Sequence, residues 1–203
     1  EVLSTDLYRE LDMDAILRDV KTRNKKLTRG EDFVPVDKLV FNDPLLESWF
    51  GDSRLNGVIQ HQTRGHIISD LSRYMFCAAF SGIHGVSPTL DRWDGRLKGL
   101  VPNHKNIDIL DDGSVKTKAH NDRFKVQIWD KPASTVVSHI SKDGHYYIHP
   151  DPTQCRSLTV REAARLQTFP DNYYFCGNRT EQFHQVGNAV PPYLAWQIAE
   201  LLG

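Results

Sequence analysis

The cysteines are the strongest candidate nucleophiles in this sequence. There are three of them, Cys77, Cys155 and Cys176, and no two form a Cys-x-x-Cys pair. Zinc knuckles and disulfide frameworks need paired or closely spaced cysteines, so we expect free thiols, as in a reducing cytoplasm. A zinc-dependent base-modifying hydrolase would need a His-x-Glu motif together with Pro-Cys-x-x-Cys. The sequence contains neither motif, which argues against that class.

Two pairs of histidines could serve as metal ligands by residue type, but their spacing does not favour a metal site. His145 and His149 are four residues apart, and His61 and His66 are five apart. Residues four apart share one face of a helix, whereas these pairs lie in segments whose patterns favour strands or loops. We therefore predict no metal site.

Four stretches have the apolar spacing of helices. They are residues 5–20, a stretch that begins at Ser69 and stops at Gly82, a stretch after Thr159, and the C-terminal residues from Pro191. Thr159 and Glu162 have the spacing of a capping box, in which each side chain bonds to the other residue's backbone. The Pro191-Pro192 pair presets φ at the start of the last helix.

Residues 123–150 have the pattern of strands. Phe124, Val126 and Ile128 alternate with polar residues, and β-branched and aromatic residues flank an Asp-Gly turn at residues 142–144, which predicts a hairpin. Residues 82–113, rich in glycine and proline, are expected to form loops with short strands. The predicted fold class is α+β: a small mixed or antiparallel sheet with flanking helices and a C-terminal helical segment.

Composition favours an ordinary globular protein, with 39% hydrophobic and 25% charged residues among 203. No run approaches the roughly eighteen apolar residues of a membrane helix, so no membrane partner is expected. The net charge of −1 offers no overall basic face for nucleic acid. One basic run favours a solvated loop over a phosphate contact; it comprises Lys21, Arg23, Lys25, Lys26 and Arg29.

Three segments resemble parts of one enzyme family. Residues 156–171 read RSLTVREAARLQTFPD and residues 185–192 read QVGNAVPP. They resemble the ninth and tenth motifs of DNA cytosine-5 methyltransferases, in the family's order. Residues 129–136, WDKPASTV, are similar to the segment in which the family's recognition domain places a threonine against the phosphate beside the target base. The resemblance is firm over about the last eighty residues and loose before them.

The resemblance implies a reaction for which this sequence lacks the main parts. In the family a cysteine thiolate attacks C6 of a flipped cytosine, a glutamate assists at N3, and S-adenosylmethionine gives its methyl group to C5. The sequence has no Pro-Cys loop, no Glu-Asn-Val segment and no Gln-x-Arg-x-Arg strand. We therefore expect a chain that is inactive alone and binds no cofactor by itself, although the complete enzyme uses S-adenosylmethionine.

The resemblance divides the chain into a target-recognition domain, residues 1–155, and C-terminal motifs, residues 156–203, that would dock on a missing catalytic domain or subunit. The partner of the recognition domain would be double-stranded DNA. The parent would be either a single-chain enzyme or a split one, and an initial Glu1 in place of Met favours a piece of a longer chain.

The resemblance also assigns candidate site residues. Thr135 would contact the phosphate, and long polar side chains around it would clamp the DNA backbone or read base edges; these are Arg123, Lys125, Ser138, His139 and Lys142. Asn188, Ala189 and Val190 would complete the cofactor pocket. The ninth motif, with Arg161 and Arg165, is interpreted as scaffold.

Two other interpretations of the motifs remain. Residues 158–166 also look like the first helix of a helix-turn-helix regulator, in which a second helix would follow within three or four residues. Aromatic, non-helical residues 169–175 follow instead. Residues 80–85, FSGIHG, look like the family's glycine-rich cofactor loop but follow a helical pattern rather than a strand, which argues against that role.

Overall fold

The computed structural model describes residue 18 and residues 29–37, 39–95, 99–142 and 144–203. The described residues divide into two compact units. Unit 1 contains residues 65–134 and 144–157, and unit 2 contains residues 29–64, 135–142 and 158–203, apart from the excluded positions. The predicted helix over residues 5–20 and the basic run up to Lys26 lie outside the described residues.

Unit 1 is organised by helix α4 (Ile68–His84), which is followed by the 3-10 helix η1 (Leu90–Arg92). Strands β3 (Ile107–Ile109) and β4 (Val115–Thr117) form an antiparallel hairpin. β3 lies in the region expected to hold loops with short strands. Helix α4 confirms the helix predicted from Ser69.

The predicted end of α4 is wrong. The helix continues through Gly82 and ends at Gly85, whose φ of 63° is left-handed and whose N–H donates to Ser81 O at 2.8 Å. Glycine adopts this conformation without a Cβ clash, which makes it a common C-terminal cap. Residues 80–84 are therefore helical, and FSGIHG is no cofactor loop.

The core of unit 1 is aromatic. Phe124, 2% exposed, lies with its ring centroid 5.3 Å from that of Trp93 and 4.8 Å from that of His145. Phe76 of α4 meets Trp93 edge-on at 5.3 Å. Aromatic pairs at such distances add to the free energy of burial, so α4, the η1 loop and residue 124 stabilise one another.

The prediction of a hairpin within residues 123–150 is wrong. The described residues of this segment contain no named strand, and pairing is limited to single bridges of Ile148 with Val126 and with Ser157. Ser138–Ser141 form the 3-10 helix η2. The physical reason is that residues 135–142 pack within unit 2 while residues 144–157 pack within unit 1, so the expected arms do not pair.

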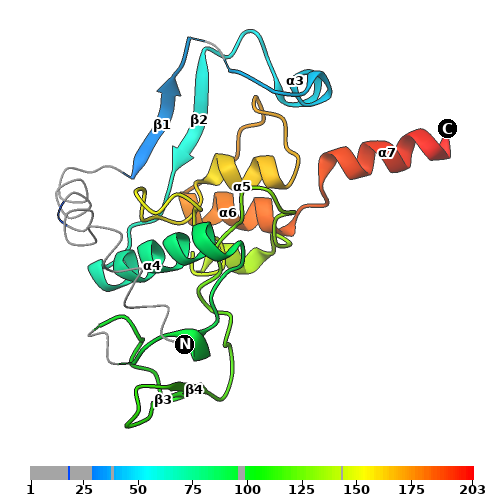
Figure 1. The fold of residues 1–203 in the computed structure, drawn as a ribbon. Helices are drawn as coiled ribbons and strands as arrows, with labels where there is room; N and C mark the ends of the chain where they lie inside the picture. The colour runs from blue at the N-terminus through cyan, green and yellow to red at the C-terminus, as the bar shows by residue number, and fades with distance from the viewer. Residues whose placement is uncertain (1–17, 19–28, 38, 96–98, 143) are drawn as a thin grey trace. The chain divides into compact units, whose positions relative to one another are not determined.

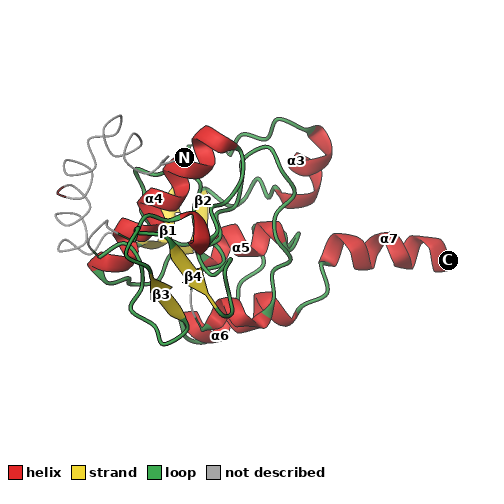
Figure 2. Cartoon of the chain, turned by 60° about the horizontal axis from the view of Figure 1, so that its bottom comes forward, coloured by secondary structure: helices red, strands yellow, loops and turns green. Residues whose placement is uncertain are grey.

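Unit 2 combines an antiparallel pair of strands with short helices (Figures 1 and 2). Strands β1 (Gly30–Pro35) and β2 (Gly57–Gln62) flank helix α3 (Pro44–Phe50) in the sequence. Helices α5 (Val160–Leu166), α6 (Arg179–Asn188) and α7 (Pro192–Leu202) complete the unit. Helices and two small antiparallel sheets confirm the α+β class.

Capping boxes start two of these helices. At α5, Glu162 N donates to Thr159 Oγ1 at 3.2 Å and Thr159 N donates to Glu162 Oε2 at 2.8 Å, as predicted. Asn178 and Glu181 form the same arrangement at α6. Helix α6 was not predicted, although Asn-x-x-Glu spacing in the sequence was a signal for its start.

Helix α7 begins at Pro192, as predicted, and extends away from the rest of unit 2 (Figure 1). None of its residues is buried, and Leu201 and Leu202 are 86% and 83% exposed. Within the part of the chain that the structure describes, no helix has the length and apolar run that crossing a membrane would require.

We predict that Phe124→Ala lowers the free energy of unfolding by about 3–5 kcal/mol, because it leaves a cavity among the rings of unit 1. Ile83→Ala is the matched control in the same unit, since Ile83 is 55% exposed on α4 and its truncation should change stability by less than about 0.5 kcal/mol. Urea denaturation followed by circular dichroism measures both. Equal effects would contradict the assignment of Phe124 to the core.

Candidate nucleic-acid interface

Residues 135–142 form the candidate recognition segment, and side chains from elsewhere in unit 2 hold its backbone. The buried amide of Gln167 donates to Val136 O at 3.3 Å, to Val186 O at 3.1 Å and to Ala189 O at 3.3 Å. These carbonyls belong to the recognition segment and to the end of α6. One side chain of the ninth motif thus joins the recognition segment to the tenth motif.

Arg64 holds the other end of the recognition segment. Its Nη1 donates to Lys142 O at 2.9 Å, and its Nη2 donates to Ser141 O. The guanidinium also lies over the ring of Phe183 on α6, 5.3 Å from the centroid. Arg64 therefore fixes the C-terminal end of η2 against α6. Arg64 was not among the predicted site residues, because no local sequence pattern around it indicates this role.

Gly187 allows α6 to lie against the recognition segment. A Cβ at this position would be 2.5 Å from Val137 O and 2.7 Å from Ser138 Cα. Both atoms are backbone, so they cannot rotate away as a side chain can. The glycine of the tenth motif is thus required for the close approach of a helix to a loop rather than for a turn.

Arg161 is the most deeply buried charge of the ninth motif, at 1% exposure. It donates to Ile59 O at 3.3 Å, Pro170 O at 3.1 Å and Tyr173 O at 2.5 Å. Burial lowers the pKa of Arg161 to about 10, so the guanidinium stays charged at neutral pH. The guanidinium thus joins β2 to the residues that follow α5, and all three of its bonds go to backbone carbonyls.

Arg165 binds Asp171 through two parallel hydrogen bonds of 2.7 and 2.6 Å, the geometry in which arginine and carboxylate interact most strongly. Asp171 N donates in turn to Phe50 O of α3 at 3.0 Å. The ninth motif therefore contacts α3, β2 and its own following loop. These contacts support its interpretation as scaffold.

The structure brings four of the candidate DNA-binding residues together in the recognition segment. Thr135, His139 and Lys142 are exposed, and Ser138 is half-buried. Arg123 and Lys125 belong to unit 1, where Arg123 Nη1 lies 3.2 Å from His104 Nε2. The assignment of these side chains to DNA contacts stays a prediction.

The candidate cofactor residues lie where α6 ends and α7 begins. Asn188 is the last residue of α6, Ala189 caps it with a φ of −76°, and Val190 is 65% exposed. Gly187 and Asn188 are helical, so the turn that leads into α7 begins only after Asn188. Three exposed or half-exposed side chains on one edge can supply a wall of a pocket but cannot enclose a ligand.

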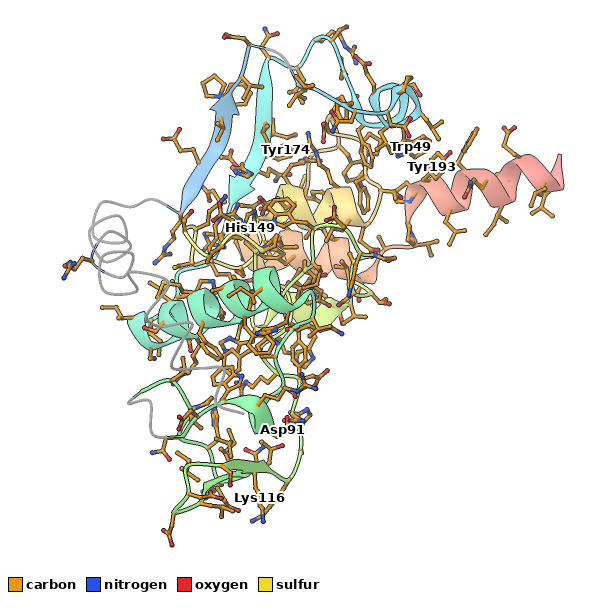
Figure 3. The ribbon with its side chains drawn as sticks, viewed as in Figure 1. Trp49, Asp91, Lys116, His149, Tyr174 and Tyr193 are labelled. Atoms are coloured by element: carbon orange, nitrogen blue, oxygen red, sulfur yellow. The ribbon has the colours of Figure 1, made fainter. Side chains whose placement is uncertain are left out.

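An aromatic cluster orients α7 at its base. Figure 3 shows Trp49 of α3 beside Tyr193 of α7, and their rings meet edge-on with centroids 4.8 Å apart. Trp49 Nε1 donates to Thr168 O at 2.8 Å, and Tyr193 N donates to Thr168 Oγ1 at 3.0 Å. The start of α7 is thereby tied to α3 and to the end of the ninth-motif helix.

Two of the three cysteine thiols are buried. Burial raises the pKa of the Cys77 thiol well above its usual range, which disfavours the thiolate that a nucleophile needs. Cys155 is also buried and donates to Pro152 O at 3.0 Å, while Cys176 is exposed.

The four histidines of the candidate pairs make hydrogen-bond contacts with other residues, and the Tyr74 hydroxyl contacts both His66 and His145. His61 lies 3.3 Å from Thr159 Oγ1, His66 lies 2.9 Å from Ser157 Oγ, and His145 lies 2.8 Å from the Tyr74 hydroxyl. Asp151 N donates to His149 Nδ1 at 3.1 Å. Among the residues that can be described, no three His, Cys, Asp or Glu side chains gather as metal ligands would.

Comparison with known proteins identifies a family and relatives that match parts of this chain. The family model of C-5 cytosine-specific DNA methylase matches residues 57–203. A type II methyltransferase of Bacillus paralicheniformis is 70% identical over 82 residues, which are 40% of this chain and 18% of the relative. A type II methyltransferase of Thalassovita gelatinovora is 49% identical over 74 residues, or 36% of this chain and 17% of the relative.

A plant relative matches at lower identity. DNA (cytosine-5)-methyltransferase 3 of Arabidopsis thaliana is 36% identical over 112 residues, which are 54% of this chain and 7% of the relative. The matched stretches thus span less than a fifth of the length of each of these three relatives.

We predict that Gly187→Ala destabilises the protein by about 1–3 kcal/mol, because the added methyl group meets backbone atoms of Val137 and Ser138. Gly82→Ala is the control: it is helical, has nothing within 4 Å of an added Cβ, and should stabilise by roughly 0.4–1 kcal/mol. Chemical denaturation measures both changes. Stabilisation by both substitutions would show that α6 does not need the glycine.

Proposed function

Because the chain belongs to the C-5 cytosine-specific DNA methylase family, we propose that it is the DNA-recognition part of a DNA cytosine-5 methyltransferase. It would hold double-stranded DNA in position while a catalytic part outside this sequence transfers the methyl group from S-adenosylmethionine to C5 of cytosine. The observation that carries the proposal is the recognition segment, whose exposed Thr135, His139 and Lys142 stand on a backbone held by Gln167 and Arg64.

A fixed backbone is what a DNA-contacting loop needs. Ordering a loop on binding costs free energy, so a segment that is already held in one conformation binds more tightly with the same contacts. The hydroxyl of Thr135 would contact a phosphate, which sets the position of the protein on the duplex, and Ser138, His139 or Lys142 would reach base edges. Side chains of the ninth and tenth motifs would thus hold in place the recognition segment that contacts the DNA.

Residues 156–203 would also dock on the catalytic part, as expected from the resemblance. Leu194, Ile198 and Leu201 of α7 are 48%, 47% and 86% exposed, an apolar surface that soluble proteins usually cover. Trp49 and Tyr193 set the direction in which α7 leaves unit 2. Asn188, Ala189 and Val190 would then form one wall of the cofactor pocket, and the catalytic part would supply the rest.

The alternative of a helix-turn-helix regulator loses its main structural support. Helix α5 ends at Leu166 and the next helix, α6, begins at Arg179, far beyond the three or four residues that the motif allows. The residues between them supply the aromatic side chains of Phe169, Tyr173 and Phe175, which pack on one another with centroids 4.9–5.0 Å apart.

We predict that the chain alone transfers no methyl group from S-adenosylmethionine to DNA. The buried Cys77 and Cys155 thiols are inaccessible to a base, and Cys176 lacks the preceding proline of the family's nucleophile loop. Incubation with labelled S-adenosylmethionine and cytosine-containing duplexes measures the transfer. Incorporation that is abolished by replacing one of these cysteines would overturn the proposed division of labour.

We predict that Thr135→Val weakens DNA binding by about 1 kcal/mol, roughly fivefold, because it removes one hydroxyl and keeps the shape. The loss should be the same for every DNA sequence, since a phosphate contact carries no base information. Thr180→Val, at an exposed position of α6 in the same unit, is the control. Binding of cognate and mismatched duplexes is measured with the chain joined to its catalytic part. A loss confined to the cognate duplex would assign Thr135 to base reading instead.

A further inference from the structure

Unit 1 contains a pocket that the recognition segment does not share. Its volume is about 360 Å³, and all of its lining residues belong to unit 1. Lys125 and Lys131 contribute two ammonium groups, and Ser87, Gln127 and Ser134 contribute polar atoms, while the remaining lining residues are apolar, glycine or proline. None of the lining residues is acidic, so the pocket carries net positive charge.

The orientation of Lys125 follows from the extended backbone on either side of it. Lys125 N donates to His145 O at 2.7 Å, and Lys125 O accepts from Ile148 N at 3.0 Å. Side chains alternate along extended backbone, and Phe124 and Val126 point into the core of unit 1. Lys125 therefore points away from the core, half-buried in the wall of the pocket.

The two lysines differ in how their ammonium groups are occupied. Lys131 Nζ donates to Gly85 O at 2.6 Å, which uses one of its three donors and keeps the group at the pocket. In the portion of the chain that the structure describes, the Lys125 ammonium has no hydrogen-bond or ion-pair partner. A half-buried cation without a counter-charge favours an anion as ligand, because the anion offsets the cost of removing the lysine from water.

The remaining polar groups are held in place by the protein. Ser87 Oγ accepts from Val126 N at 3.0 Å and donates to Phe124 O at 3.2 Å. Gln127 is buried and accepts from Ser134 N at 3.0 Å while donating to Tyr146 O at 2.9 Å. These bonds fix the walls of the pocket, including the residue that directly precedes Thr135. The pocket is thus built before any ligand arrives.

We propose that this pocket binds a phosphate of the DNA backbone through Lys125 and Lys131, in addition to the phosphate contact proposed for Thr135. The assignment rests on the proposed function, and of the two roles predicted for Lys125, backbone clamp and base reader, it selects the backbone clamp. Base edges lie at the floor of a groove, and a lysine set in a concave wall does not reach them. Phosphates protrude from the duplex and enter such a wall.

The first experiment probes the pocket without DNA. Inorganic phosphate is titrated into the ¹⁵N-labelled 203-residue chain at constant ionic strength, with chloride as the comparison anion. Saturable shifts of the Gly85, Ser87 and Ser134 amides that disappear in Lys125→Gln are expected. The control is Lys116→Gln, an exposed lysine on β4 of the same unit (Figure 3), which should keep the shifts. If the amide shifts are absent, or are unchanged in Lys125→Gln, the proposal that this pocket binds phosphate is wrong.

The second experiment measures duplex binding against salt by the chain joined to its catalytic part. Lys125→Gln should weaken binding about tenfold at low salt, equally for cognate and mismatched duplexes. It should also reduce the slope of log affinity against log salt by roughly 0.9, the value for one lost phosphate contact. Lys116→Gln should leave the slope unchanged.

The outcomes of the two experiments separate the two proposals. If Lys125→Gln relaxes discrimination at one base position, or if duplex DNA fails to displace bound inorganic phosphate, the backbone-clamp role is wrong while recognition by Thr135 can still hold. If phosphate binds in the pocket but duplex DNA binds neither the chain alone nor the chain joined to its catalytic part, the proposed function fails and the assignment of the pocket to DNA fails with it. A loss of affinity in Lys131→Gln matching that in Lys125→Gln would support the shared site.

Discussion

Two buried side chains of unit 2 donate hydrogen bonds to backbone carbonyls of segments that are far apart in the sequence. Gln167 bonds to the carbonyls of Val136, Val186 and Ala189, and Arg161 bonds to those of Ile59, Pro170 and Tyr173. Buried carbonyls without partners would cost stability, so irregular segments can pack inside the unit only where such donors reach them. The placement of the recognition segment depends on this condition.

In unit 2, the residues that hold the recognition segment in place are different from those proposed to contact DNA. Most side chains of the ninth motif are buried, and Arg161 and Gln167 among them bond to backbone, whereas Thr135, His139 and Lys142 of the recognition segment are exposed. A set of related proteins can keep the inward set and change the outward one, because replacing an exposed side chain disturbs few contacts.

Local sequence signals predicted α4, α5 and α7 but missed α3 and α6, and they predicted the sheet in the wrong place. The capping box at Thr159 and the proline pair before α7 act within a few residues, so the sequence alone locates those helix starts. The alternation of Phe124 and Val126 correctly reported burial, but the partner of an extended segment is chosen over long distances. Here the chain passes from unit 1 to unit 2 at Thr135, and no local sequence pattern indicates this change of unit.

The sequence by itself determined the family and the α+β class, because these depend on short motifs and apolar patterns whose residue types and spacing are specific. Tertiary structure decided which side chains share a surface. It placed Arg64 beside the recognition segment from a distant part of the chain, made Gly187 a point of close approach, and put Lys125 in the wall of a pocket with Lys131. Such placements result from packing between remote segments, and the free energy of packing is not encoded in any one of them.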